Sequence, residues 1–277
     1  MTAGTFELKN SDFEKISRLV YEQCGIYLHE GKKELVKARL SKRLRASGYQ
    51  SFTDYYHHVT TPDGTDELIS MLDSISTNLT SFFREESHFV RLRHIIQTAI
   101  ERSGHHGPKL KFKIWSAGCS IGEEPYTLAI TALETAGPHS LDISILATDI
   151  STKVLRVAET GIYTQDRVKG IATPILKKYF QVGTGKSEGH VRVKAELRHL
   201  ISFQRFNLME RFSAHQDYDV IFCRNVMIYF DKKTQNDLVN KFHDSLKSGG
   251  YFFVGHSESL TGLKHHFKYV EPSVYLK

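Results

Sequence analysis

Cysteine is scarce in this chain, and its placement excludes a disulfide framework. The three cysteines, Cys24, Cys119 and Cys223, are widely spaced and odd in number, and no Cys-x-x-Cys pair occurs. Such usage is typical of a protein from a reducing compartment, so we expect a cytoplasmic location. Neither Cys119 nor Cys223 has a histidine or other base beside it in sequence, and we interpret both as small buried residues.

Long apolar runs, targeting signals and metal motifs are also lacking. No apolar stretch approaches the ~20 residues that span a bilayer, and the polar, partly acidic residues 1–15 do not resemble a secretory signal. Histidines form adjacent pairs, at 57–58, 105–106 and 265–266, instead of the i, i+4 spacing of a helical metal site, so we predict no metal. With 277 residues, 40% of them hydrophobic, one large or two modest globular domains are expected.

The first 76 residues show helical periodicity and no strand pattern. Residues 11–24 form an amphipathic stripe for which Ser11 is a candidate N-cap. Residues 32–47 predict a second helix that ends at Gly48. Two shorter helices follow. We therefore predict an all-α N-terminal domain over 1–76, followed by a linker over 77–87.

From residue 109 onward the period changes, and strands alternate with helices. Buried-type strands are predicted over 110–118, where the last residues form a turn, over 142–150 and over 218–225, each followed by a helical pattern. This alternation predicts an α/β domain over 88–277, with a parallel sheet covered by helices on both faces. The rhythm breaks at about 179–206, where we predict an inserted β-hairpin. The last residues predict a second, antiparallel hairpin.

The stretch "KIWSAGCSIGEEPYTLAI" places a small-residue turn where the first strand gives way to a helix. Gly118 and Gly122 allow a ligand to approach the backbone closely. Glu123 and Glu124 stand at the start of the helix, and the turn contains no lysine or arginine, so it disfavours phosphate and suits a cation. Asp149 ends the second strand, where an acid commonly receives ribose hydroxyls. A cationic amino-acid nucleoside, S-adenosylmethionine, fits all of these features.

Further candidates come from the ends of later strands. Asn225 follows the third strand, and Asn207 and Leu208 follow another, where they would cover an adenine. Each feature also has a structural explanation, because acids at a helix start are stabilised by the helix dipole and asparagine is common in turns.

Five ordered segments resemble one family. "STNLTSFFRE", "WSAGCSIGEEPYTLAI", "ATDIS", "FCRNVMIYFD" and "GHSESL" resemble the motifs of the CheR family, the S-adenosylmethionine-dependent methyltransferases of bacterial chemotaxis receptors. The resemblance covers nearly the whole chain. It implies a Rossmann-like class I methyltransferase sheet with a small β-subdomain, preceded by a helical domain. The implied activity is methyl transfer to glutamate side chains of the receptor's cytoplasmic helical bundle, which yields glutamyl methyl esters and S-adenosylhomocysteine.

The resemblance also assigns the cofactor contacts. They fall on Asn78, Thr80, Arg84, Glu123, Asp149, Asn207, Leu208, Asn225 and Val226. The linker would thus close over the cofactor, and Arg84 would also orient the substrate carboxylate. No catalytic base is needed, because a glutamate with a reference pKa of about 4.3 is already ionised at neutral pH.

Two surfaces are expected to bind the receptor. Residues 32–47 carry seven basic residues against one acid, and we assign Lys37, Lys42 and Arg43 to contacts with an acidic receptor bundle. The inserted hairpin resembles the β-subdomain of family members that bind a peptide at the receptor's C-terminus. The residues assigned to this tail contact are Gly183, Gly185, Gly189, His190, Val191 and Arg192. We expect the strand at 190–193 to lie at a sheet edge, open to an added strand.

Alternative interpretations remain at this point. The basic helix would also suit a nucleic-acid methyltransferase, although no Pro-Pro-aromatic turn follows the third strand and no aromatics interleave with the basic residues. A non-catalytic cofactor sensor would show the same motifs. The basic face and the hairpin would each be unremarkable as solvated surfaces. We expect a monomer that meets the membrane only through its receptor and binds no nucleic acid.

Overall fold

The structure, a computed structural model, describes most of the chain. The described residues are 6–76, 79–103, 109–137, 141–212 and 217–277. Within those ranges no helix combines the length and apolar character that crossing a bilayer requires.

The chain divides into two compact units. One comprises Met1–Thr77 together with Tyr229–Gln235, and the other comprises Asn78–Ile228 together with Asn236–Lys277. The return of 229–235 to the first unit differs from the predicted α/β domain, which ran unbroken from 88 to 277. A β-bridge between Ile26 and Phe230 joins this segment to the first unit.

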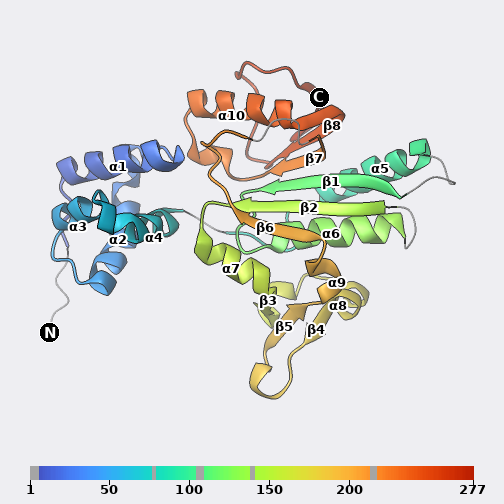
Figure 1. Ribbon diagram of the computed structural model, residues 1–277, viewed down its shortest axis with the longest axis horizontal. Helices are drawn as coiled ribbons and strands as arrows, with labels where there is room; N and C mark the ends of the chain where they lie inside the picture. The colour runs from blue at the N-terminus through green and yellow to red at the C-terminus, as the bar shows by residue number, and fades with distance from the viewer. Residues whose placement is uncertain (1–5, 77–78, 104–108, 138–140, 213–216) are drawn as a thin grey trace. The chain divides into compact units, whose positions relative to one another are not determined.

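The first unit is helical, as its sequence pattern indicates. Its helices are α1 (Asn10–Cys24), α2 (Lys33–Ser47), α3 (Phe52–Val59) and α4 (Thr65–Ile75), with short 3₁₀ turns at Glu30–Lys32 and Pro62–Gly64 (Figure 1). Gly48 ends α2 in the left-handed conformation, with a φ of 78°. The predicted cap at Ser11 is wrong, because α1 begins one residue earlier, after Lys9, which makes no side-chain cap.

The second unit is built on a seven-stranded sheet of order β6-β2-β1-β7-β8-β10-β9. Its strands are β1 (Leu110–Ala117), β2 (Leu141–Asp149), β6 (Ile201–Arg205), β7 (Tyr218–Cys223), β8 (Leu246–Val254), β9 (Lys268–Glu271) and β10 (Val274–Leu276). The first five strands in this order pair in parallel, whereas β10 pairs antiparallel with both β8 and β9. The predicted α/β architecture and the C-terminal hairpin are confirmed.

Helices cover both faces of this sheet (Figure 1). They are α5 (Glu86–Ser103), α6 (Glu123–Ala136), α7 (Thr152–Thr160) and α10 (Lys232–Ser245). Alternate residues of β1 point to opposite faces. Phe112 and Ile114 join Leu92 of α5 in one buried core. Trp115 faces the other way, and its ring centroid lies 5.2 Å from that of Phe242 on α10.

The strand order creates a topological switch point, which is where open α/β sheets commonly bind their ligands. The chain crosses from β1 to β2 on one side and returns to β7 on the other, so the sheet has a switch point at the carboxyl end of β1. Ala117 is in register with Thr148, and Ser116 with Phe222. The turns that follow β1, β2 and β7 therefore meet at one edge.

A separate three-stranded antiparallel sheet, of order β3-β5-β4, corrects the predicted insertion. Its strands are β3 (Ile162–Thr164), β4 (Phe180–Val182) and β5 (His190–Val193), with α8 (Thr173–Tyr179) and α9 (Ala195–Arg198) beside them (Figure 1). The predicted edge strand, β5, is central, and β6 belongs to the main sheet although the predicted insert reached residue 206. Three residues of β3 are too few to give a strand pattern in the sequence.

Candidate functional site

The turn after β1 has a backbone that few residue types can adopt. Gly118, Ser120 and Gly122 have φ values of 83°, 50° and 92°. A Cβ at Gly122 would lie 2.8 Å from the Cβ of Ala158 on α7, and one at Gly118 would lie 2.4 Å from Cγ2 of Val226. Glycine at both positions thus lets this turn pack closely against α7 and against the segment that follows β7.

Asp149 is anchored at the end of β2 by this turn. Its carboxylate is largely buried and accepts hydrogen bonds from the backbone N–H of Ser120 at 2.8 Å and from that of Ser151 at 2.9 Å. Ser151, not Asp149, caps the following helix, since its side chain accepts from Val154 N. The carbonyl of Asp149 accepts from Phe206 N at 3.0 Å, which brings Asn207 to the same edge of the sheet.

Glu123 is a buried carboxylate without good hydrogen bonds. Its exposed fraction is 0%, and neither oxygen has a hydrogen-bond partner of acceptable geometry among the described residues. Nε of Arg167 lies 3.2 Å from Oε1, close enough for an ion pair but poorly aligned. Burial raises the pKa of Glu123, and Arg167 and the hydroxyl of Thr80 oppose that rise only in part. A cationic ligand group would stabilise this carboxylate.

Glu124 belongs to a different network, centred on Arg224. This arginine is 6% exposed and donates from Nη1 to Glu124 at 3.0 Å. It also donates from Nε and Nη2 to Oε2 of Glu85, at 3.2 and 2.9 Å, and from Nη2 to the carbonyl of Arg84. The hydroxyl of Ser116 donates to the other oxygen of Glu124 at 2.7 Å. The two glutamates that open α6 therefore have separate roles, and Glu124 is structural.

Burial and the charge of Arg224 have opposite effects on the pKa values of Glu124 and Glu85, the two carboxylates that Arg224 contacts. Burial raises the pKa of Glu124, and Arg224 opposes this without reversing it. Burial also acts to raise the pKa of Glu85, but the charge and hydrogen bonds of Arg224 outweigh it, so that pKa lies below its ordinary value. The network joins the end of β7 to the linker and to the start of α6.

Asn225 adopts a left-handed backbone conformation, with a φ of 60°, directly after this network. A buried carboxylate, Glu258, holds it there by accepting from Asn225 N at 2.8 Å, from Gly255 N at 2.6 Å and from Ile228 N at 3.1 Å. Burial raises the pKa of Glu258 although these N–H groups oppose it. Glu258 lies within the "GHSESL" segment, where no local signal in the sequence indicates this contact.

The linker residues lie partly at this edge. Thr80 contacts the Glu123 network, since its carbonyl accepts from Nη1 of Arg167 at 3.4 Å. Arg84 is half-buried and donates from Nη1 to the carbonyl of Leu79 at 2.8 Å. Asn78, the third predicted linker contact, lies outside the described residues.

Asn207 and Leu208 form a closed turn. Oδ1 of Asn207 accepts from Met209 N at 3.0 Å, and the Leu208 side chain is buried. Nζ of Lys241 donates to the carbonyls of Met209 and Glu210, at 3.2 and 3.0 Å, which fixes the turn against α10. An apolar side chain in such a position suits an aromatic ring.

The cysteines behave as predicted. Cys119 and Cys223 are buried, and burial raises the pKa of both thiols well above the ordinary value. A thiol that is buried and protonated is a poor nucleophile.

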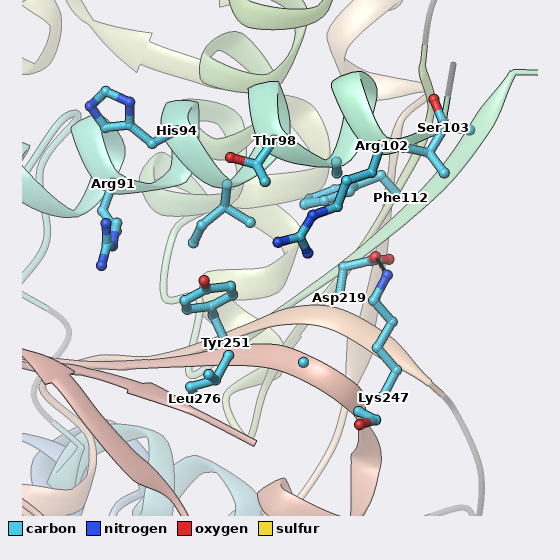
Figure 2. Close-up of a pocket in the computed structure, with 15 residues that line it drawn as sticks. Arg91, His94, Thr98, Arg102, Ser103, Phe112, Asp219, Lys247, Tyr251 and Leu276 are labelled. Atoms are coloured by element: carbon cyan, nitrogen blue, oxygen red, sulfur yellow. Dashed lines mark hydrogen bonds and ion pairs between the residues drawn. The ribbon is translucent and has the colours of Figure 1, made fainter.

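A cavity of about 550 Å³ lies at the opposite edge of the sheet (Figure 2). It is lined by α5, by Leu110 at the start of β1 and by Asp219 near the start of β7. Figure 2 shows Arg102 reaching across it from α5, above the ion pair of Asp219 and Lys247. Because ligands of parallel sheets bind at the carboxyl ends of strands, this cavity is not the candidate cofactor site.

Comparisons with known proteins decide the family. Residues 11–76 match the family described as the CheR methyltransferase all-alpha domain, and residues 78–276 match the CheR methyltransferase SAM binding domain. This chain belongs to the CheR methyltransferase family. The resemblance and fold class inferred from the sequence are thus confirmed, and the second unit contains a SAM-binding methyltransferase domain.

Two relatives with chemotaxis names align with almost the whole of this chain. Chemotaxis protein methyltransferase 2 of Pseudomonas aeruginosa is 40% identical over 271 residues, which are 98% of this chain and 94% of that protein. The chemotaxis protein methyltransferase of Escherichia coli is 38% identical over 269 residues, covering 97% and 91%. A solved S-adenosylmethionine-dependent methyltransferase from Mesorhizobium loti is 16% identical, with a TM-score of 0.32 over 58% of this chain and 52% of its own. At this TM-score the likeness carries no weight for the function.

Proposed function

We propose that this CheR-family protein transfers a methyl group from S-adenosylmethionine to glutamate side chains of a chemoreceptor's cytoplasmic bundle, forming glutamyl methyl esters. The observation that carries the proposal is the buried, poorly hydrogen-bonded carboxylate of Glu123 at the glycine turn. This feature calls for a cationic partner, and the amino group of S-adenosylmethionine is one. The relatives' names, chemotaxis protein methyltransferases, support this proposal.

The residues present fit this cofactor. Glu123 would bind its amino group, and Asp149, held by two backbone N–H groups, would accept from the ribose hydroxyls. Bound S-adenosylmethionine supplies an electrophilic methyl group on a sulfonium. The remaining proposed contacts, some of which would cover the adenine or close the linker, are Asn78, Thr80, Arg84, Asn207, Leu208, Asn225 and Val226.

The protein's task in such a transfer is orientation and exclusion of water. A substrate glutamate is ionised at neutral pH, so no base has to remove a proton. Because the charges of sulfonium and carboxylate neutralise each other as the methyl group moves, a dry site that holds them in line lowers the barrier. The buried thiols of Cys119 and Cys223 are no rivals for the methyl group. Arg84 would orient the substrate carboxylate.

Fewer basic residues of α2 are available for receptor contact than the sequence suggested. Arg43 donates from Nε to Oε1 of Glu67 at 2.6 Å, and Tyr55 donates to the same oxygen at 2.8 Å. The Arg43 charge is therefore used inside the helical unit, where it holds α2 to α4. Lys42 is exposed and Lys37 is half-buried, with Glu34 at 3.9 Å. We retain Lys37 and Lys42 for receptor contact and assign Arg43 a structural role.

The receptor's C-terminal tail would bind the small sheet at β4 instead of β5. His190 and Arg192 of β5 are exposed, but Val191 is buried, so its side chain cannot contact a peptide. β4 is an edge strand, and Val182 is 54% exposed. An extended peptide could add as a further strand there, beside the turn that contains Gly183, Gly185 and Gly189.

The chemical test uses labelled S-adenosylmethionine with three samples: a chemoreceptor cytoplasmic fragment, RNA, or no acceptor. We expect label in the receptor only, and we expect mild alkali to release it as volatile methanol, because an ester is hydrolysed where an N-methyl group is not. Replacing the modified glutamates of the receptor by alanine should abolish labelling. Label in RNA, or label that resists alkali, would contradict the proposal.

A further inference from the structure

Three potential metal ligands gather beside the Arg224 network. They are Glu85 of the linker, His88 in the first turn of α5 and His256, which follows β8. One carboxylate oxygen and one ring nitrogen of each histidine all lie within 4.8 Å of one another. The two imidazole centroids are 4.7 Å apart. None of these residues is among the proposed cofactor or substrate contacts.

His88 is the unusual member of this cluster. It is 1% exposed, and neither of its ring nitrogens has a hydrogen-bond partner among the described residues. The nearest acidic oxygen, Oε2 of Glu85, lies 3.5 Å from Nδ1 without hydrogen-bond geometry. A buried polar atom left without a partner costs about 1–3 kcal/mol, so such a nitrogen points to a ligand that is bound to it.

Carboxylates outnumber the one buried arginine of the network beside the cluster. The buried Arg224 is shared by two carboxylates, Glu85 and Glu124, so this network contains one more acidic than basic side chain. A carboxylate has about four acceptor positions. Arg224 and the backbone N–H of His256 engage three positions on Glu85, which leaves a lone pair for an ion.

The cluster can be reached from solvent. A cavity of about 730 Å³ is lined by both histidines and by Ser87, Arg91, His94 and Glu271. The side chain of His256 is exposed, and Ser87 Oγ lies 3.2 Å from its Nε2. A contact of this kind orients the ring of a ligating histidine.

Although the histidine spacing in the sequence predicts no metal, we propose that Glu85, His88 and His256 bind one divalent ion of the Zn²⁺ type, at a site separate from the cofactor turn. Two imidazoles and one carboxylate form a common ligand set for zinc, with the fourth position open to water. At bond lengths of about 2.1 Å, tetrahedral ligand atoms stand roughly 3.4 Å apart. The ligand atoms now lie within 4.8 Å of one another, and rotation of the exposed His256 side chain can bring its ring nitrogen closer to the other two. Because Glu85 also contacts Arg224, a bound ion would tie the linker, α5 and β8 together.

The binding test is calorimetric titration of the full, untagged chain with Zn²⁺ in a buffer that does not chelate. We expect one site per chain that is tighter than any surface histidine provides. His256→Ala should weaken it by at least ~10–100-fold, the effect that loss of even an outer contact has at metal sites. The matched control is His199→Ala, since His199 is exposed in the same unit and lies outside the cluster. This control should bind Zn²⁺ as the wild type does.

Two further measurements keep the proposal falsifiable. Co²⁺ in place of Zn²⁺ should give the intense visible absorption of a four-coordinate ion in the wild type and the His199→Ala variant, and not in His256→Ala. Zn²⁺ should also raise the unfolding temperature of the wild type and not of His256→Ala. Equal Zn²⁺ affinity in wild type and His256→Ala, or a Co²⁺ spectrum of the six-coordinate aquo type, would show that the cluster holds only water. Cofactor affinity is measured in parallel, so failure of this site and failure of the methyltransferase proposal remain distinguishable.

Discussion

At the scale of single residues, the candidate cofactor edge contains four buried or half-buried carboxylates with different partners. Asp149 is held by backbone N–H groups, Glu124 by a buried arginine and Glu258 by three backbone N–H groups. Glu123 has a poorly aligned arginine and, among the described residues, no hydrogen bond of good geometry. Since identical side chains become structural or ligand-binding according to their partners, each position responds differently to substitution.

Asp149→Asn should reduce the affinity for S-adenosylhomocysteine by about tenfold or more. A hydrogen bond to a charged acceptor contributes about 1.5–3 kcal/mol, and about 1.4 kcal/mol corresponds to a factor of ten. The amide would also turn an NH₂ group toward Ser120 N or Ser151 N, both of which donate to this side chain. Calorimetric titration measures the change. Asp142→Asn, on the exposed part of the same strand, is the control and should bind normally. Equal affinities for the two variants would refute the ribose assignment.

Glu123→Gln should stabilise the cofactor-free protein while weakening cofactor binding. Burial raises the pKa of Glu123, so the folded protein binds this proton more tightly than the unfolded chain does. The free energy of unfolding of the wild type therefore falls as the pH rises above the ordinary carboxyl value near 4.5, because an ionised group must then stay buried. Glutamine avoids this cost, and Arg167 is exposed enough to remain hydrated.

Scanning calorimetry at about pH 7.5 and at about pH 4.5 tests this expectation. The variant should unfold at a higher temperature than the wild type at the higher pH, and the difference should shrink at the lower pH. Titration with S-adenosylhomocysteine should show weaker binding. Glu159→Gln, on the exposed side of α7, should change neither quantity. A variant that is less stable at neutral pH would mean that the Arg167 ion pair outweighs the burial of Glu123.

At the scale of elements, the basic residues of α2 divide between contacts inside the helical unit and exposure to solvent. Arg39 and Arg43 hold it to α4, the former through the carbonyls of Ile75 and Ser76. Other basic side chains face solvent. A count of charges in the sequence overstates the basic surface, because two of the charges are used inside the unit.

Reversing Lys37 and Lys42 to glutamate should slow receptor methylation and leave cofactor affinity unchanged. The same substitutions should weaken the dependence of the wild-type rate on salt, because exposed charges are screened over about 10 Å at 0.1 M ionic strength. Initial rates against receptor concentration, at two salt concentrations, measure both effects. The control variant reverses Lys15 and Arg18, which are exposed on α1. Normal methylation by the Lys37 and Lys42 variant would show that this face is only solvated.

Arg43→Ala distinguishes the structural from the docking contribution of α2. It removes the hydrogen bonds to Glu67, whose side chain is only 12% exposed, so we expect a loss of about 1–3 kcal/mol in stability. Lys42→Ala should leave the unfolding temperature close to that of the wild type. If Arg43→Ala were as stable as the wild type and methylated the receptor poorly, the original assignment of Arg43 to receptor contact would be restored.

At the scale of the whole molecule, the proposed tail contact would separate holding the receptor from modifying it. A tether of suitable length gives an effective concentration near the millimolar range, so methylation would not need a strong affinity at the catalytic edge. The small β3-β5-β4 sheet has two edge strands, β3 and β4, that could make such a contact.

A peptide that copies the partner receptor's last residues should bind the β4 edge without cofactor. Gly183 N donates to His190 O at 2.9 Å, so the preceding N–H, that of Val182, points away from β5. Val182→Pro removes this outward donor, keeps the ladder and should abolish peptide binding. On the other edge, Gln165 N donates to Gly189 O, so the N–H of Thr164 points away from β5. Thr164→Pro removes this donor from the β3 edge, and the variant should bind the peptide normally. Fluorescence anisotropy of a labelled peptide measures both.

Replacing 183–189 by a two-residue turn should also abolish peptide binding and spare cofactor affinity. If the shortened protein and Val182→Pro bind the peptide as the wild type does, receptor docking must rest on α2 alone. Loss of binding in Thr164→Pro only would move the contact to β3.

The sequence by itself determined the local features of this protein. The helical repeats, the glycine that ends α2, the alternation of strands and helices and the glycine turn before Glu123 all depend on residues within one or two turns of each other. They could be predicted because hydrophobic period and backbone preference act over such short distances. The ordered motifs also sufficed to indicate the family, and the position of Asp149 at a strand end followed from the same periodicity.

Only the tertiary structure decided which charged groups pair. Arg224 meets Glu85 and Glu124 across 139 and 100 residues of sequence, and Glu258 holds Asn225 across 33. No local pattern separates Glu124, which accepts a hydrogen bond from a buried arginine, from Glu123, whose arginine partner is poorly aligned. The return of 229–235 to the helical unit and the three-residue strand β3 likewise depend on distant partners. Ion pairing and sheet pairing are set by proximity in space, which a one-dimensional pattern does not record. The proposed metal ligand His88 could likewise be identified only in the structure, because Glu85 and His256 meet it there through tertiary packing.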